Sequence, residues 1–225
     1  MLKLSLQYAY SCAETMSFND YITLVDGYGL GFTPEAKTPE IDMPFQGDYT
    51  QHDFIQQIID TLVDAGITPD RVWLQSFLPN DIFYWIKNEP DFGAQAVYLD
   101  ERADLTKNGY AEAVASLPDL KARGVNIVAP SIWQLVTIDN ATKSIVPSTY
   151  MTTAQEVGLD VIAWSFDRSG PLEVDGGGYY YESVTKLINN DGDEYTVLDV
   201  IAQYALGVFS DWPATVTYYA NCMGL

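Results

Sequence analysis

Residues 158–166 have the sequence GLDVIAWSF, in which a glycine is followed directly by a short run of mainly apolar residues. The same order occurs at 124–131, GVNIVAPS, and at 93–99, GAQAVYL. Glycine supplies the left-handed conformation that ends many helices. A continuous apolar run is typical of a parallel strand that is buried on both faces. The pattern therefore predicts that a helix ends at each of these glycines and that a buried strand follows.

The same order of elements repeats along the whole chain. The glycines that mark it are Gly29, Gly66, Gly93, Gly124, Gly158 and Gly207. The distances between them suit βα units. Amphipathic segments fill the intervals, and we expect helices over residues 17–27, 52–66, 80–90, 111–124, 147–158 and 196–206. Asn80 is the expected N-cap of the third of these helices.

This count predicts a single α/β domain over residues 1–225, built as a (β/α)8 barrel with six of its eight βα units present and two strands missing. One unit is enlarged by a Gly- and Tyr-rich insertion at 171–195. A doubly wound open sheet is the alternative, because counting βα units does not separate the two folds. No G-x-G-x-x-G sequence follows a strand, which argues against a dinucleotide-binding version of that alternative.

The composition excludes several classes of function. Lys and Arg total 11 against 31 Asp and Glu, so the formal charge is −20. Such a field repels nucleic acids and anionic membrane surfaces, although a small anionic ligand can still bind at a local cationic site. No apolar run approaches the ~20 residues of a membrane span. The only cysteines are Cys12 and Cys222, which excludes a zinc cage and leaves their pairing open.

Candidate site residues lie where the expected strands end, because reacting groups gather at that face of parallel βα folds. Glu35 and Lys37 are two residues apart, so both side chains point to one side of a strand. They would hold a metal through Glu35 and a phosphate oxygen through Lys37, or form an exposed ion pair. Gln75 would orient a ligand or bond to neighbouring backbone. Trp164 would form an apolar wall for a substrate or belong to the core.

Two further polar residues favour structural interpretations. Asp211 is expected to cap the closing helix. The single histidine, His52, is expected to be a solvated residue in the first turn of a helix. No Ser-His-Asp or Cys-His arrangement can therefore be assembled, and we assign no catalytic residue.

Taken together, four strand ends resemble those of the glycerophosphodiester phosphodiesterase family. They are Glu35-x-Lys37, Gln75-Ser76-Phe77, Trp164-Ser165-Phe166 and Ser210-Asp211-Trp212-Pro213. The resemblance extends from about Thr15 to Leu225 and is strongest to the secreted fungal and bacterial branch. It implies a (β/α)8 barrel that hydrolyses glycerophosphodiesters to an alcohol and sn-glycerol 3-phosphate, with calcium or magnesium as cofactor. It also implies that Glu35 ligates the metal, Lys37 contacts the phosphate, and Gln75 and Trp164 line the substrate cleft.

The chain departs from the family at its start. The family's first strand carries a His-Arg pair, and its second carries Glu-x-Asp followed by a second His. Neither motif occurs here, so the first two strands and two expected metal ligands are missing. We therefore expect this chain alone to be inactive as a hydrolase.

Three explanations of that departure remain open. The chain is a truncated form of an active phosphodiesterase, a non-catalytic phosphodiester-binding or structural relative, or a half that another chain completes. Open sheet edges would favour self-association and lower the cooperativity of unfolding. The start, MLKLSLQYAYSCAE, is too short and polar for a signal peptide, so no N-terminal targeting segment is expected. The secreted branch and the acidity imply an extracellular or cell-envelope location.

Overall fold

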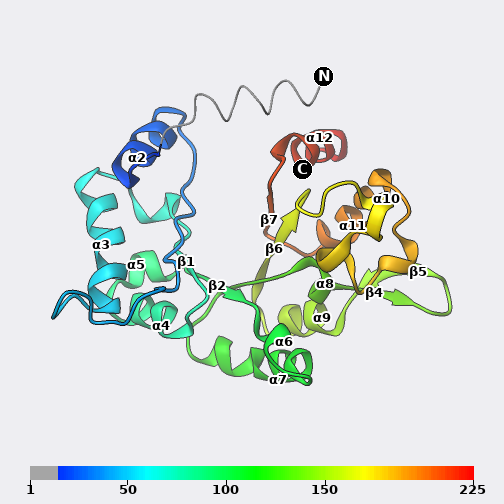
Figure 1. Cartoon of the computed structure of the whole chain (residues 1–225), viewed down its shortest axis with the longest axis horizontal. Helices are drawn as coiled ribbons and strands as arrows, with labels where there is room; N and C mark the ends of the chain where they lie inside the picture. The colour runs from blue at the N-terminus through cyan, green and yellow to red at the C-terminus, as the bar shows by residue number, and fades with distance from the viewer. Residues whose placement is uncertain (1–14) are drawn as a thin grey trace.

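The computed structural model describes residues 15–225 and forms an elongated α/β domain (Figure 1). Its centre is a parallel sheet whose strands follow one another in chain order. These are β1 (Gln75–Ser76), β2 (Val97–Asp100), β3 (Ile127–Pro130), β6 (Asp160–Phe166) and β7 (Gly207–Ser210). The question of a Cys12–Cys222 bond lies outside the described residues.

The strand order decides between the two folds that the sequence left open. In a doubly wound sheet the order reverses at a switch point. Here the order is β1-β2-β3-β6-β7 without a reversal, so the doubly wound alternative is wrong. The sheet is instead a curled half-barrel, consistent with an incomplete barrel of the (β/α)8 type.

The first strand, predicted after Gly29 in the run LGFTPEAK, corresponds to an extended segment at residues 32–36 beside β1 at the edge of the sheet. Isolated parallel bridges join Phe32 to Val72 and Glu35 to Gln75. Backbone hydrogen bonds on this side include Phe32 N–H to Arg71 O at 2.7 Å and Ala36 N–H to Gln75 O at 2.8 Å. The segment is therefore held in parallel register with β1 without forming a regular strand.

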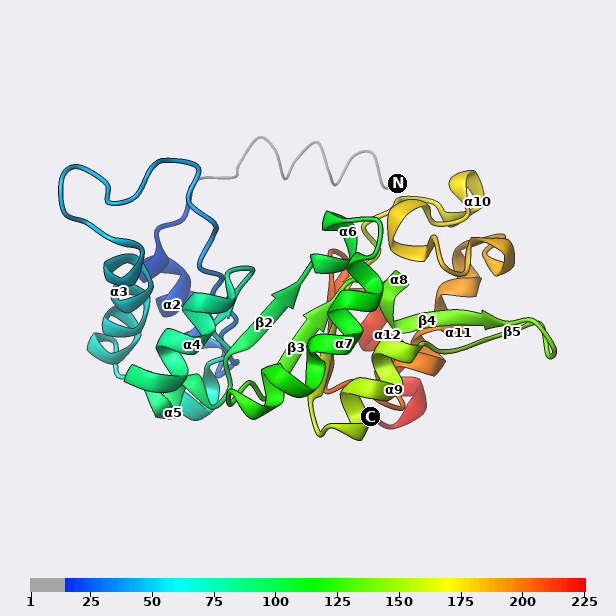
Figure 2. The same ribbon diagram turned by 90° about the horizontal axis from the view of Figure 1, so that it is seen from below.

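Helices cover one face of the sheet. The longer ones are α2 (Phe18–Gly27), α3 (Gln51–Asp64), α4 (Pro79–Asn88), α7 (Gly109–Ala122), α9 (Thr149–Glu156), α11 (Glu194–Ile201) and α12 (Pro213–Met223). Single-turn helices join them: α5 (Pro90–Gly93), α6 (Arg102–Leu105), α8 (Ile132–Leu135) and α10 (Leu172–Asp175). Figure 2 shows α4, α7 and α9 arranged along the sheet, with α2 and α3 at the end that carries the N-terminal part.

Alternate strand residues divide the apolar interior into two clusters. Residues such as Tyr98 and Val128 belong to the large cluster shared with the helices. Their neighbours Leu99 and Ala129 point to the opposite, concave face, where Trp164 packs against the smaller cluster. The side-chain alternation of a strand explains this division. In a curled sheet the concave face corresponds to the interior of a barrel.

The helices expected over residues 17–27 and 52–66 are confirmed as α2 and α3. The helices α2 and α3 begin at capping boxes, formed by Ser17 with Asp20 and by Thr50 with Asp53. The predicted glycine turns at 29, 66, 124 and 158 have positive φ, for example +94° at Gly124. The chain therefore turns from helix to strand there as expected.

Other local expectations are wrong. The helix α4 begins at Pro79 with Leu78 as N-cap rather than Asn80, because proline suits the first helical position. Gly93 belongs to α5, and an added Cβ there would lie 2.6 Å from the Ile86 backbone, so this glycine allows close helix packing. Gly207 is the first residue of β7.

Two parts of the fold were not anticipated in detail. The strands β4 (Val136–Asp139) and β5 (Ser144–Pro147) form an antiparallel hairpin between β3 and α9. The insertion at 171–195 contains α10 and short 3-10 helices at Gly178–Tyr181, Thr185–Leu187 and Asp191–Asp193. A further 3-10 turn at Pro69–Arg71 precedes β1.

Candidate functional site

A cavity of about 330 Å³ at the carboxyl ends of the strands contains all the site residues that the sequence predicted. Its volume lies within the range of small-molecule sites. The lining side chains come from the 32–37 segment, from β1, β2, β6 and β7, from the residues next to them, and from the insertion at 171–195: Glu35, Lys37, Gln75, Phe77, Leu99, Trp164, Ser165, Arg168, Tyr180, Phe209, Ser210 and Asp211. We call it the strand-end cavity.

Glu35 and Lys37 form an ion pair in this cavity. Lys37 Nζ lies 2.6 Å from Glu35 Oε2, as expected for side chains two residues apart on an extended segment. The Lys37 side chain is 77% exposed and that of Glu35 is 19% exposed. The pair therefore combines a mostly buried carboxylate with an ammonium group that is exposed to solvent.

Gln75 and Trp164 are both held by hydrogen bonds to backbone carbonyls. Gln75 Nε2 donates to Thr33 O at 2.8 Å, so the Gln75 amide bonds to neighbouring backbone, which is one of the two interpretations left open above. Trp164 Nε1 donates to Ala129 O at 2.6 Å, and its ring is partly exposed to the cavity. These bonds fix the orientation of both side chains before any ligand arrives.

The sequence missed Arg168 and misassigned Asp211. Arg168 Nη1 lies 3.3 Å from Asp211 Oδ2, which makes a second ion pair at the cavity wall. Asp211 therefore does not cap α12, whose N-cap is Trp212 without a side-chain hydrogen bond. Arg168 follows the end of β6 by two residues, so the rule of inspecting strand ends could have found it.

A network of acidic side chains supports the strand-end cavity near Ser210. Ser210 Oγ donates to Asp167 Oδ2 at 2.7 Å, and the Asp167 backbone N–H donates to Glu194 Oε1 at 3.1 Å. Tyr181 Oη donates to the same oxygen at 2.7 Å. Glu194 is 5% exposed, and its burial, with Asp167 close by, raises the pKa of its carboxyl group. The network joins the insertion, α11 and the strand ends.

His52 lies outside the strand-end cavity. It is exposed in the first turn of α3, and its ring stacks on that of Tyr84 with a centroid distance of 4.7 Å. This confirms the structural interpretation of the single histidine. It also means that imidazole does not serve as an acid or base in this cavity.

The described residues do not fit a metal centre of the expected kind. Within residues 15–225, no three His, Cys, Asp or Glu side chains are grouped as metal ligands. The two carboxylates of the cavity, Glu35 and Asp211, each face a cationic side chain. We therefore derive no chemical step through a metal, and Glu35 as a ligand of calcium or magnesium stays a prediction.

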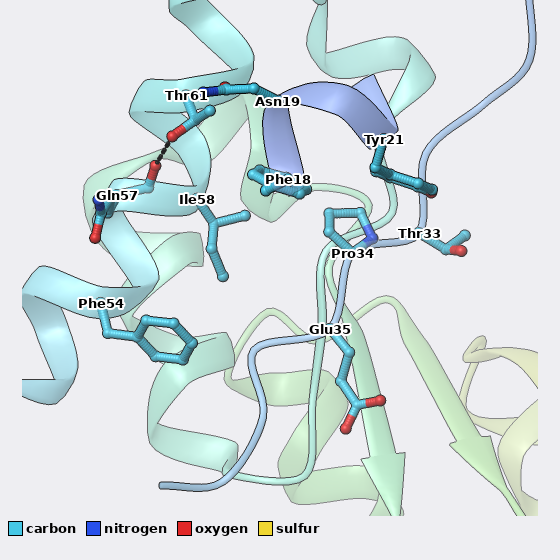
Figure 3. A pocket seen from close by; sticks show the side chains of 10 residues that line it. All are labelled: Phe18, Asn19, Tyr21, Thr33, Pro34, Glu35, Phe54, Gln57, Ile58 and Thr61. Atoms are coloured by element: carbon cyan, nitrogen blue, oxygen red, sulfur yellow. Dashed lines mark hydrogen bonds between the residues drawn. The ribbon is translucent and has the colours of Figure 1, made fainter. Parts of the chain in front are cut away.

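A larger cavity of about 610 Å³ lies between α2, α3 and the 32–36 segment. Figure 3 shows its mainly apolar lining, in which Phe18, Pro34, Phe54 and Ile58 surround the space. Of the candidate site residues, Glu35 alone borders it. Its chemistry is that of an apolar groove, so we place the functional site in the smaller strand-end cavity.

None of the helices in residues 15–225 combines the length and apolarity that crossing a membrane requires. No family model matches the chain. Over 222 residues the chain is 45% identical to a protein of Arthroderma benhamiae named "Extracellular protein", covering 97% of this chain and 90% of that one.

Similarity to a solved structure supports the fold. A crystal structure from Silicibacter pomeroyi DSS-3, of a protein named as a glycerophosphoryl diester phosphodiesterase, matches with a TM-score of 0.58 at 16% identity. The match covers 92% of this chain and 57% of that one, so the chain spans little more than half of that structure. The resemblance inferred from the strand ends is thereby supported at the level of the fold, and the secreted branch stays a prediction.

Proposed function

Because the chain belongs to the same protein family as the extracellular protein of Arthroderma benhamiae, and has a phosphodiesterase-like fold, we propose that it binds glycerophosphodiesters in the strand-end cavity. The observation that carries the proposal is the meeting of Lys37 and Arg168 with Gln75 and Trp164 in one small cavity. The chain then acts as a phosphodiester-binding module on a phosphodiesterase scaffold. Hydrolysis, by the resemblance, would also require the His-Arg and Glu-x-Asp motifs, which this sequence lacks.

The distribution of charge supports phosphate binding at this place. Only 11 Lys and Arg are present in a chain of charge −20, yet two of them line one cavity. Their partners Glu35 and Asp211 lie in partly exposed ion pairs, which contribute about 0–1 kcal/mol each. Lys37 or Arg168 can therefore exchange its carboxylate partner for a phosphate oxygen at little cost in free energy. The hydrogen bonds that form to the phosphate are charge-assisted.

The same residues argue against hydrolysis by this chain alone. General acid–base catalysis needs a titratable group within hydrogen-bond reach of the reacting oxygen. The cavity's carboxylates are ion-paired, Ser210 donates to Asp167, and His52 lies on α3. We propose that the chain retains the substrate-binding half of the fold without its acid–base machinery.

The proposal includes an extracellular location, which the name of the Arthroderma benhamiae relative and the acidic composition support. A separate proposal is that a second copy or another chain associates with this one at the open edge of the sheet. The edge at residues 32–36 supports association, since its backbone bonds to the β1 side use Phe32, Pro34 and Ala36, and none of them uses Glu35.

The test is calorimetric titration of the chain with glycerophosphocholine and with sn-glycerol 3-phosphate. We expect Lys37→Ala to weaken binding of both by about tenfold, because it removes a charge-assisted contact. Lys87→Ala, an exposed lysine in the last turn of α4, is the matched control and should bind as the unaltered chain does. Absence of binding, or equal losses in the two variants, would overturn the proposal.

A hydrolysis assay tests the second half of the proposal. The chain is incubated with glycerophosphocholine and calcium or magnesium, and release of sn-glycerol 3-phosphate is followed. We expect no release. Release that disappears in Glu35→Ala would show that the chain is a complete metal-dependent hydrolase.

A further inference from the structure

Aromatic side chains from four separate segments line the strand-end cavity. Phe77 follows β1, Trp164 lies on β6, Tyr180 belongs to the insertion, and Phe209 lies on β7. The Trp164 ring centroid lies 6.0 Å from that of Phe77 and 6.0 Å from that of Tyr180, both edge-to-face. We call these four side chains the aromatic wall.

The aromatic wall is held in place before a ligand binds. The indole N–H of Trp164 donates to Ala129 O at 2.6 Å. Tyr179 stacks on Trp164 with a ring-centroid distance of 6.5 Å and packs edge-to-face on Tyr180 at 5.0 Å, and its hydroxyl donates to Asp104 Oδ2 at 2.6 Å. Because these rings are already ordered, little conformational entropy is lost when a ligand contacts them.

The faces of the aromatic wall are not used by the protein's own cations. Among the described residues, the cation–π contacts lie elsewhere, with Arg71 over Phe32, Arg102 over Tyr98 and Arg123 over Phe83. The cavity also contains two carboxylates in a strongly acidic chain. Aromatic faces and nearby negative charge both attract a cation.

The wall discriminates between kinds of cation. A primary ammonium group is compact and strongly hydrated, and it carries three N–H donors that need acceptors. The indole N–H of Trp164 is a donor that is already used, phenylalanine rings offer no acceptor, and Tyr180 carries the only oxygen among the four side chains. A quaternary ammonium group donates no hydrogen bond and is recognised by aromatic faces.

We propose that the aromatic wall is a headgroup subsite for a quaternary ammonium group. This inference rests on the proposed function, because it requires Lys37 and Arg168 of the same cavity to bind the phosphate of the same ligand. The preferred ligand is then a zwitterionic glycerophosphodiester whose headgroup is choline-like. The cavity's two cations and two carboxylates match such a zwitterion in charge.

The test compares three probes by calorimetric titration of the full chain: glycerophosphocholine, glycerophosphoethanolamine and sn-glycerol 3-phosphate. We expect glycerophosphocholine to bind about tenfold more tightly than the ethanolamine compound. Trp164→Leu should bring the ratio of the two affinities down to about one. Trp164→Phe should keep most of the preference, because a ring remains.

Two controls keep the outcomes separate. Trp212→Leu removes a half-exposed tryptophan outside the strand-end cavity and should leave the preference unchanged. Tyr180→Leu alters the wall from a different segment, so it tests the subsite if Trp164→Leu fails to fold. Equal affinity for the two diesters would overturn the subsite and leave the proposed function standing. Failure of every probe to bind would overturn both.

Discussion

Replacement of Arg102 by glutamine should destabilise the protein by breaking a buried ion pair beside the strand-end cavity. Asp100 ends β2 next to Leu99 of the cavity lining, and its side chain is completely buried. Arg102 donates from Nε to Asp100 Oδ1 and from Nη2 to Oδ2, both at 2.7 Å. Tyr150 Oη also donates to Oδ2 at 2.7 Å.

The expected loss of stability follows from the burial of Asp100, which loses its ion-pair partner in Arg102→Gln. Removing one partner of a buried ion pair costs about 3–5 kcal/mol. The lower end applies here, because the Arg102 side chain is 28% exposed and Tyr150 still donates to Asp100. About 3 kcal/mol corresponds to a fall in Tm of roughly 6–12 °C for a chain of this size.

The assay is a double-mutant cycle of Arg102→Gln and Asp100→Asn, followed by thermal and urea unfolding. We expect the double variant to lose less stability than the sum of the singles, with a coupling energy of about 1–3 kcal/mol. Arg168→Gln breaks an exposed ion pair and should cost no more than about 1 kcal/mol. Additive losses, or an Arg102→Gln effect as small as that of Arg168→Gln, would refute the reasoning.

Three other results are expected. Burial raises the pKa of the Glu194 carboxyl, so the stability that its protonated form contributes is complete below the unfolded-state pKa and is lost as pH rises through the folded-state pKa. Glu194→Gln should therefore reduce the decrease of the unfolding free energy with rising pH, measured by urea unfolding at several pH values. An unchanged pH dependence in the variant would contradict this argument. Gly93→Ala should cost roughly 1–3 kcal/mol by thermal unfolding, because its Cβ would lie 2.6 Å from the α4 backbone. Gly27→Ala, which meets nothing within 4 Å, should cost nothing, and equal effects would contradict the packing argument. Finally, light scattering should detect association through the 32–36 edge at high concentration, whereas a monomer with a sharp two-state melt would argue against it.

The sequence alone determined the elements whose signals are local. The glycines at 66 and 124 act within a few residues of themselves, so the helix ends before them could be predicted. The caps Ser17 and Thr50, which the structure adds, are equally local. The spacing of Glu35 and Lys37 placed both side chains on one side for the same reason. Inspection of strand ends then selected four residues that do share a cavity.

Only the tertiary structure decided what completes that cavity. Asp211 pairs with Arg168 across 43 residues, and its position just before α12 suggested a cap instead. Tyr180 reaches the wall from an irregular insertion that has no periodic pattern. The strand order, which excluded the doubly wound fold, likewise depends on pairing between distant segments. Such contacts arise from the packing of the whole chain, and no local window of sequence contains them.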